Sequence, residues 1–391
     1  MNTQNTPVHI RLWHHDFWRM AIANLLLSMS VYMLIPVLPL WLMDSVNMSY
    51  EETGILFGAF GFGLFLLGAM TSYLVQRFRR NMVCVIAIIG MMACLAIFYY
   101  VNQFHQDVCG FSLMLIQRIA FGAFFGLAQM VLASTLIIDI SESFQRTEAN
   151  HSASWFARFS LSLGPVTSFL IYPLYGFSAV VLASGVCALL SVLLILLVYF
   201  PFRAPEEKVS LFSCDRFFLP QGYILFINLF LITLAIGMVL ALPLSLHFYS
   251  MMMTGFLVAI LAQRFVFREA ELKSEVVTGL VLIGSALLMM LTRSQTIVGF
   301  ISPLFVGFGL GIIGSRFLLF FIKLSRHCQR GTSLSTYNLG WESGIAIGVG
   351  AGYVICRSDY EQILTYALCL IILSLILYQF SHQWFLKHKN R

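Results

Sequence analysis

Charged residues are scarce in this chain of 391 residues. Only 10% are Asp, Glu, Lys or Arg, and 59% are hydrophobic, whereas soluble domains carry roughly 25% charged residues. Long apolar runs recur from Phe17 to Leu386 with only short polar breaks between them. No sizeable aqueous domain fits between these runs, so the sequence predicts a protein that lies almost entirely in a lipid bilayer.

Several motifs are also missing. The eight cysteines are scattered, without a Cys-x-x-Cys pair or a Cys/His cluster, which argues against a zinc site, a redox pair or a disulfide framework. No Walker motif is present, and the nine histidines form no catalytic set with Asp and Ser. We therefore expect no metal, no cofactor and no enzymatic or ATP-driven activity.

The apolar runs have the length of membrane helices. A crossing takes roughly 17 to 25 residues, and runs this long and uniform exclude the alternating strands of a membrane barrel. The first run is too long for a signal peptide and lacks an Ala-x-Ala cleavage site, so we expect it to be retained. The twelve predicted transmembrane helices are 17–43, 52–75, 82–101, 111–138, 150–174, 177–200, 220–246, 249–267, 275–292, 296–322, 332–356 and 361–384. The predicted fold is an all-α integral membrane bundle.

The basic residues fall almost entirely on one side of this topology. The opposite side has only Arg293 and Arg357. By the positive-inside rule both termini are cytoplasmic, in a multi-pass protein of a bacterial-type plasma (inner) membrane. Topology accounts for the net charge of +6, so no nucleic-acid partner is needed. The residues on the basic side are Arg11, Arg19, Arg77, Arg79, Arg80, Arg146, Arg203, Lys208, Arg216, Arg264, Arg268, Lys273, Lys323, Arg326, Arg330, Lys387, Lys389 and Arg391.

Four charges remain inside the predicted helices. Arg316 lies near a cytoplasmic helix end and can extend to the interface, whereas Arg118, Arg158 and Glu342 lie deep. Each deep charge costs about 2.5–3.5 kcal/mol on insertion scales, so it should face protein or a water-filled path. Glu342 is the only acid expected within the membrane.

An internal repeat divides the chain. It predicts two pseudo-symmetric six-helix halves, 1–200 and 220–391, joined by a short cytoplasmic linker, 201–219. Arg158 and Glu342 then occupy equivalent positions, about midway across the membrane. The matched pairs are Asn24/Asn228 and Pro39/Pro243 at a spacing of 204, Gly122/Gly307 and Gly126/Gly311 at 185, and Arg146/Arg330, Arg158/Glu342 and Gly164/Gly348 at 184.

The eighth predicted helix is unusually short in this alignment. Thr53-Gly54 and the "QRF" at 76–78 match Thr254-Gly255 and the "QRF" at 263–265, but the second pair lies much closer together. Either this helix begins earlier, near Tyr249 after a very tight turn, or it is an incomplete crossing.

Three segments resemble signatures of the major facilitator superfamily, over the whole length of the chain. In "SYLVQRFRRN" Ser72 stands in the glycine position, Gln76 in the aspartate position, and Arg77 and Arg80 are retained. The chain therefore lacks the acid of the family's usual ion-pair lock of the outward-open state. The other two segments are "RIAFGAFFG", with Arg118, Gly122 and Gly126 of the signature linked to proton coupling, and "SLSLGPVTS", with Gly164 and Pro165 of the antiporter signature.

The resemblance implies a drug/proton-antiporter-like transporter. Helices 1, 4, 7 and 10 would line its substrate cavity, and proton-coupled efflux by alternating access would be its activity. The proton gradient would be the energy source. The predicted cavity residues are Asn24, Ser28, Tyr32, Gln129 and Asn228, with Asn338 on the eleventh helix. The predicted gating or structural residues are Arg77, Arg80, Gly122, Gly126, Gly164, Pro165, Gly307 and Gly311.

The deep charges have competing interpretations. A carboxyl group at Glu342 can exchange a proton, as a proton-coupled carrier requires, or it can pack the eleventh helix against the second. Arg118 is either part of the coupling machinery or bonded to backbone carbonyls of the first helix. Arg158 faces the interface between the halves or the cavity, where it binds an anionic group or holds one state; Pro165 loosens its helix.

The substrate is expected to be a small organic, amphipathic solute. Two interior arginines and one acid stand among many Phe and Met residues, which suits a lipophilic molecule with an anionic group. An importer or uniporter on the same fold is the alternative, and a non-transporting sensor is a further one. We expect a monomer.

Overall fold

The computed structural model describes residues 12–104, 110–200, 210–267 and 271–389, and its regular elements there are all helical. The N-terminal helices are α1 (His15–Tyr32), α2 (Leu34–Asp44), α3 (Tyr50–Leu66), α4 (Thr71–Arg77), α5 (Arg80–Phe104), α6 (Phe111–Val131), α7 (Ile137–Asp139) and α8 (Arg146–Leu196). The C-terminal helices are α9 (Tyr223–Leu240), α10 (Leu246–Phe265), α11 (Leu272–Thr292), α12 (Thr296–Leu324), α13 (Arg330–Val354) and α14 (Tyr360–His388). Short 3₁₀ turns are η1 (Gly68–Met70), η4 (Pro220–Gly222) and η5 (His327–Gln329), and η3 (Leu132–Leu136) is a π-helical turn. The all-α prediction is confirmed for this part of the chain.

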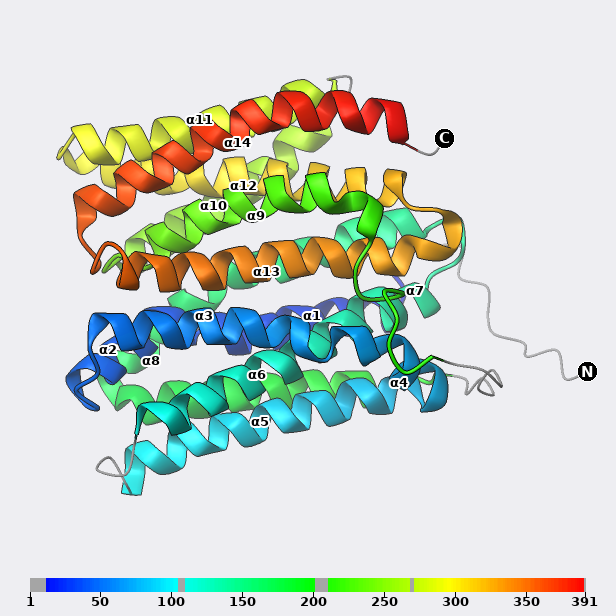
Figure 1. Cartoon of the computed structure of the whole chain (residues 1–391), viewed down its shortest axis with the longest axis horizontal. Coiled ribbons are helices and arrows are strands. Elements are labelled where there is room, and N and C mark those ends of the chain that lie inside the picture. Colours follow the sequence, from blue (N-terminus) through cyan, green and yellow to red (C-terminus); the bar gives the residue numbers. More distant parts are fainter. Residues whose placement is uncertain (1–11, 105–109, 201–209, 268–270, 390–391) are drawn as a thin grey trace, which may run out of the picture.

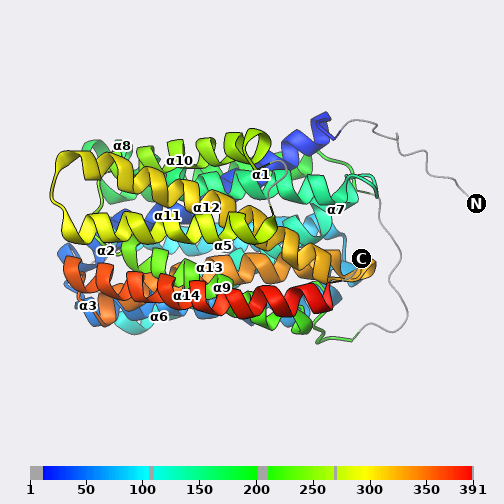
Figure 2. The same cartoon turned by 90° about the horizontal axis from the view of Figure 1, so that it is seen from above.

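The helices form one elongated bundle with roughly parallel axes (Figure 1). The N-terminal helices lie together on one side and most C-terminal helices on the other, with α13 packed against α3 between them. We call the end of the bundle where α1 begins and α14 ends the basic end; Figure 2 shows both there. The predicted basic residues Arg11, Arg203, Lys208, Arg268 and Arg391, and positions 201–209 of the predicted linker, lie outside the described residues.

The described helices account for twelve crossings. Ten helical stretches are long and apolar enough to span a membrane. One of them, α8, has 51 residues and turns at Gly176, whose φ of 72° is not helical, so it supplies two crossings. The more polar α13 has 25 residues, about 37 Å at 1.5 Å per residue, which is also long enough. Counting α8 as two crossings and adding α13 brings the ten stretches to the predicted twelve.

The eighth crossing is complete. Helix α10 has 20 residues, about 30 Å, which matches the hydrocarbon thickness. It begins at Leu246, earlier than expected, after a tight turn. The predicted end of the preceding helix at 246 was wrong: α9 ends at Leu240, because Pro243 has no amide hydrogen with which to continue the helix.

Proline also explains the break in the first crossing. Helix α1 ends at Tyr32, and α2 continues from Leu34. Pro36 stands four residues after Tyr32, and it has no N–H to bond the Tyr32 carbonyl, so the helical ladder is interrupted there. The break lies at the depth where Tyr32 reaches the C-terminal helices.

Predicted glycines bring α6 into backbone contact with α3. A Cβ on Gly122 would lie 2.3 Å from the Phe60 carbonyl oxygen, and one on Gly126 would lie 2.6 Å from the Leu64 carbonyl oxygen. Real Cβ atoms do not approach carbonyl oxygens so closely. The two glycines therefore pack helices within the N-terminal group, as small residues do in membranes.

The same contact recurs between α12 and α10. A Cβ on Gly307 would lie 2.0 Å from the Met252 carbonyl oxygen, and one on Gly255 would lie 2.2 Å from the Leu304 carbonyl oxygen. The α12–α10 pair thus repeats the α6–α3 pair, which supports the predicted equivalence of Gly122 and Gly307.

These contacts correct one predicted repeat match. A Cβ on Gly63 of α3 would lie 2.3 Å from the Ile119 carbonyl oxygen of α6, just as a Cβ on Gly255 of α10 would meet a carbonyl of α12. Gly255 therefore corresponds to Gly63, and the match to Gly54 was wrong. The apparent shortness of the eighth helix came from that chance Thr-Gly match.

Candidate functional site

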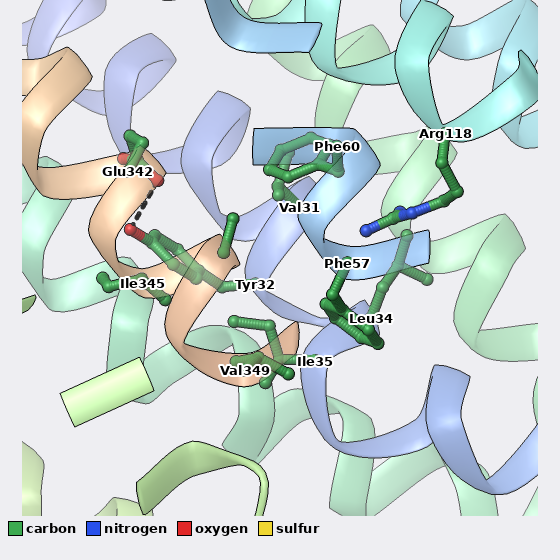
Figure 3. Close-up of a pocket in the computed structure, with 11 residues that line it drawn as sticks. Val31, Tyr32, Leu34, Ile35, Phe57, Phe60, Arg118, Glu342, Ile345 and Val349 are labelled. Carbon is green, nitrogen blue, oxygen red and sulfur yellow. Dashed lines mark hydrogen bonds between the residues drawn. The ribbon is translucent and has the colours of Figure 1, made fainter. Parts of the chain in front are cut away.

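A small cavity lies at the middle of the bundle. Its volume is about 20 Å³, and one water molecule needs roughly 10–15 Å³ of such space. Figure 3 shows Glu342 and Arg118 on opposite sides of it, with apolar and aromatic side chains between them. The lining residues are Val31, Tyr32, Leu34, Ile35, Phe57, Phe60, Arg118, Glu342, Ile345, Ala346 and Val349.

Glu342 joins the two groups of helices through its carboxylate. It projects from α13 and is only 4% exposed. Tyr32 of α1 donates its hydroxyl to Oε2 at 2.7 Å, and Gln129 of α6 donates from Nε2 to Oε1 at 2.9 Å. Both donors belong to the N-terminal helices, so a change in the charge of this carboxylate acts directly on the contact between the groups.

Arg118 has no carboxylate partner among the ion pairs of the described residues. Its Nε donates to the Leu56 carbonyl of α3 at 3.5 Å, and its guanidinium lies over the rings of Phe57, Phe60 and Phe121 at 4.8–5.6 Å. Nη1 is buried without a hydrogen-bond partner. The carbonyl that Arg118 binds belongs to the second crossing, not to the first as the structural interpretation expected.

Arg158 is held by the other group of helices. It projects from α8 and is 2% exposed. Nη1 donates to the Gly311 carbonyl at 3.0 Å and to the Ser315 hydroxyl at 3.2 Å, both on α12. Within α8, Nη2 donates to the Ser154 hydroxyl at 2.8 Å, and the guanidinium lies 4.0 Å from the centre of the Trp155 ring. The arginine therefore faces the interface between the groups, as predicted from its cost.

Arg158 and Glu342 occupy matching places in the repeat. Glu342 of α13 contacts Gln129 of α6, and Arg158 of α8 contacts Gly314 of α12, where a Cβ would lie 2.9 Å from the arginine. Gln129 and Gly314 are equivalent at the same spacing of 185 that relates Gly122 to Gly307. The contacts thus support the equivalence of Arg158 and Glu342, although the residues form no ion pair with each other among the described ion pairs.

The groups touch at both ends of the bundle. Away from the basic end, a Cβ on Gly54 of α3 would lie 2.5 Å from the Gly350 carbonyl oxygen of α13. At the basic end, a Cβ on Gly331 of α13 would lie 2.6 Å from the Ser134 carbonyl oxygen of η3. Glu342 lies between these contacts along α13, so the two groups meet on both sides of the central cavity. We describe this conformation as occluded.

Other predicted cavity residues lie elsewhere in this conformation. Asn24 donates to the Ala153 carbonyl of α8 at 3.0 Å, and Asn228 donates to the Ser374 carbonyl of α14 at 3.3 Å. Ser28 is fully buried, and its hydroxyl lacks a partner. None of the three lines the central cavity, and neither does half-buried Asn338. Of the six predicted cavity residues, the structure brings Tyr32 and Gln129 to Glu342.

The predicted gating residues have mixed neighbours. Arg80 pairs with Asp139 at 2.5 Å, which joins α5 to α7, while Arg77 ends α4. A Cβ on Gly164 would lie 2.9 Å from Tyr32 Cβ, and Pro165 follows inside α8. Gly164 therefore lets α8 approach α1 next to the residue that binds Glu342.

A second buried acid lies near the basic end, in the first turn of α11. Glu275 is 1% exposed and binds Arg316 Nε through Oε2 at 2.6 Å. Helix α11 begins at Leu272, earlier than the predicted start at 275, which carries Glu275 into the first turn against α12. Arg316 is neutralised by this pair. Glu342 remains the buried carboxylate without a cationic partner among the described ion pairs.

Sequence reasoning missed the network around Arg158. The Ser315 hydroxyl accepts a hydrogen bond from Arg158 and donates one to Gln263 Oε1 of α10 at 3.1 Å. Ser154 stands four residues before Arg158, one helical turn away, which is a signal for a partner on the same face. Gln263 had no comparable signal, because its distance from Arg158 depends on how α10 packs.

Comparisons with known proteins agree with this architecture. A family model described as Major Facilitator Superfamily matches residues 20–349. The crystal structure of the human organic anion transporter MFSD10 (TETRAN) is similar with a TM-score of 0.67 and 16% sequence identity, over 93% of this chain and 98% of that chain. A bacterial homologue of the iron transporter ferroportin in the outward-facing state gives a TM-score of 0.65 and 15% identity, with the same coverage. No curated protein matches the chain in sequence.

The solved structures, at these identities, show a shared fold. The family model covers most of the chain and includes most of α1, the lining of the central cavity and the greater part of α13. The chain is therefore a multi-pass membrane protein that transports a small-molecule substrate as a secondary transporter, is not an enzyme, and belongs to the Major Facilitator Superfamily.

Proposed function

We propose that this transporter exports a small organic, amphipathic solute in exchange for protons. The N-terminal half (1–200) and the C-terminal half (220–391), joined by the linker 201–219, rock about the central cavity as a monomer. The termini and the basic end face the cytoplasm of a bacterial-type plasma membrane. The observation that carries the proposal is the contact of Glu342 with Tyr32 and Gln129 across the two halves.

Glu342 is the proton site in this proposal. As a carboxylate it accepts two hydrogen bonds from the opposite half, and hydrogen bonds to a charged group are roughly twice as strong as those between neutral groups. A proton on Glu342 removes that charge and weakens both contacts. Binding a proton at the cavity thereby changes the free energy of the occluded state.

Arg118 supplies the preference for an anionic group on the substrate. Its Nη1 is buried without a partner, and it lies across the cavity from Glu342 with Phe57 and Phe60 beside it. An open cavity at this position offers one cation among aromatic surfaces, which matches an amphipathic anion. The similar fold of a human organic anion transporter is in keeping with this assignment.

The test uses tryptophan fluorescence of the purified protein against pH. Trp341 precedes Glu342 in α13 and is buried, so its emission reports the charge and packing at the site. We expect a transition in the wild type that is absent in Glu342→Gln, because glutamine cannot take up the proton. Glu275→Gln is the matched control, since it removes a buried carboxylate elsewhere and should keep the transition.

A transition that survives in Glu342→Gln would place the proton site elsewhere. If the transition is lost, candidate solutes are screened in proteoliposomes for movement against an imposed proton gradient. Movement that ignores the gradient would favour an importer or uniporter on the same fold.

A further inference from the structure

The segment 213–219, which precedes α9, is bound to the N-terminal helices. The Ser213 amide donates to the Ala69 carbonyl at 2.9 Å. The ring of Phe217 lies against Gly68, where a Cβ would come within 2.0 Å of the ring. A side chain at position 68 would displace this phenylalanine, so the segment packs in a defined position against η1 and α4.

The same segment is bound to the start of α13. The Arg216 amide donates to the Thr332 hydroxyl at 2.8 Å, and the Leu219 amide donates to the Thr336 hydroxyl at 2.7 Å. These threonines lie one turn apart on the face of α13 that meets the segment. The segment 213–219 therefore bridges the two halves at the basic end.

Asp215 is the charged centre of this bridge. Its Oδ2 accepts from the Ser72 hydroxyl of α4 at 3.2 Å, and its Oδ1 accepts from the Thr332 hydroxyl of α13 at 3.0 Å. Thr332 is in the first turn of α13, where the helix presents unpaired N–H groups and a partial positive charge. One carboxylate thus binds one hydroxyl from each half, next to the N-terminus of α13.

The backbone at this point is constrained. Arg216 has a φ of 58°, in the left-handed region that residues other than glycine rarely adopt. Such a conformation persists when surrounding contacts determine it. The Arg216 side chain supplies one of these contacts, because Nη1 donates to the Thr135 hydroxyl of η3 at 3.1 Å.

We infer that Asp215 is the gating carboxylate that holds the basic end closed. The position on α4 that could supply an acid has a glutamine, Gln76, which donates from Nε2 to the Ser72 hydroxyl of the same helix at 2.9 Å. The linker carries the acid instead. Opening the basic end separates α4 from α13, and Asp215 must then release Ser72 or Thr332. This inference depends on alternating access and not on the substrate or the coupling ion.

The test is hydrogen–deuterium exchange of the full-length protein in lipid nanodiscs. In Asp215→Asn the side chain keeps one acceptor oxygen and loses its charge, so we expect several-fold faster exchange in 71–77 and 330–336. Exchange in the outer helix α14 should be unchanged, which separates opening from unfolding. Glu148→Gln is the control, because it removes an exposed carboxylate from the first turn of α8, near the basic end.

A second substitution tests position rather than stability. Ser72→Ala removes the α4 hydroxyl that donates to Asp215, and we expect it to speed exchange in 71–77 and 330–336 as Asp215→Asn does, with little further change when the two are combined. Unchanged exchange in Asp215→Asn, faster exchange throughout the molecule, or fully additive effects of the two substitutions would overturn the inference. None of these results depends on whether Glu342 binds a proton.

Discussion

Arg158 and Arg118 are buried cations whose contacts are carbonyls, hydroxyls and aromatic rings. Neither is paired with a carboxylate among the described ion pairs, while Arg316 is paired with Glu275. A buried charge without a counter-ion is costly. At the scale of single residues, the burial of these two charges therefore opposes folding. Both lie at the interface or the cavity, where a transporter needs groups that exchange partners.

Because burying an unpaired charge is costly, substitutions at Arg158 should differ in their effect on stability. Arg158→Lys keeps the charge but loses the planar set of donors that binds Gly311, Ser315 and Ser154, so it should lower stability by about 1–3 kcal/mol. Arg158→Met removes the charge along with the bonds and should destabilise less. Thermal unfolding followed by intrinsic fluorescence measures both.

A larger loss in Arg158→Met than in Arg158→Lys would mean that the charge itself stabilises the fold. Arg316→Lys serves as the control, since lysine retains the ion pair with Glu275 and should change the unfolding temperature little.

Much of the site was predictable at this scale because a deep charge is visible in an apolar sequence. Arg118, Arg158 and Glu342 were found in that way. Tyr32 and Gln129 were nominated from the cavity-lining helices, but their shared contact with Glu342 depends on the break at Pro36 and on how α13 packs. The pairing of Glu275 with Arg316 was not predicted, because it depends on how α11 packs against α12.

At the scale of helices, glycines set which surfaces approach closely. Gly122 and Gly307 pack helices within a half, and Gly54 and Gly350 pack α3 against α13 across the halves. The sequence shows the glycines but not their partners, since a helix can turn any face to several neighbours. That is why the Thr-Gly match at 54 and 255 misled the alignment and the contacts corrected it.

These two classes of glycine should respond differently to alanine. In Gly350→Ala the new Cβ lies 2.6 Å from the Gly54 carbonyl oxygen, so we expect α3 and α13 to separate at the end opposite the basic end while the fold persists. A cysteine at Val349, which lines the cavity, should then react several-fold faster with a membrane-impermeant maleimide, as quantified by mass spectrometry at that residue.

Gly122→Ala is the comparison for this experiment. Its Cβ meets the Phe60 carbonyl oxygen within one half at 2.3 Å, so it should lower the unfolding temperature without a selective rise in labelling at 349. Equal labelling in both variants would contradict the assignment of Gly350 to the gate.

At the scale of the whole molecule, the two halves meet at both ends around a cavity of about 20 Å³, which is room for roughly one water molecule. The twelve crossings and their approximate bounds could be predicted from the length of the apolar runs. The repeat could be predicted from residues that recur at a nearly constant spacing. The state of the transporter could not, because the occluded state depends on small differences among contacts such as Gly54 with Gly350 and Gly331 with Ser134. Asp215 lay in a segment that sequence reasoning treated only as a linker.

The central claim is that the charge of Glu342 controls the contact between the halves. The most direct measurement is the distance between spin labels at Ser45 and Ile355, which are exposed at the end opposite the basic end, as pH falls from alkaline to mildly acidic. The account predicts that the distance distribution shifts with pH in the wild type and stays fixed in Glu342→Gln. An identical pH-dependent shift in both proteins would contradict it.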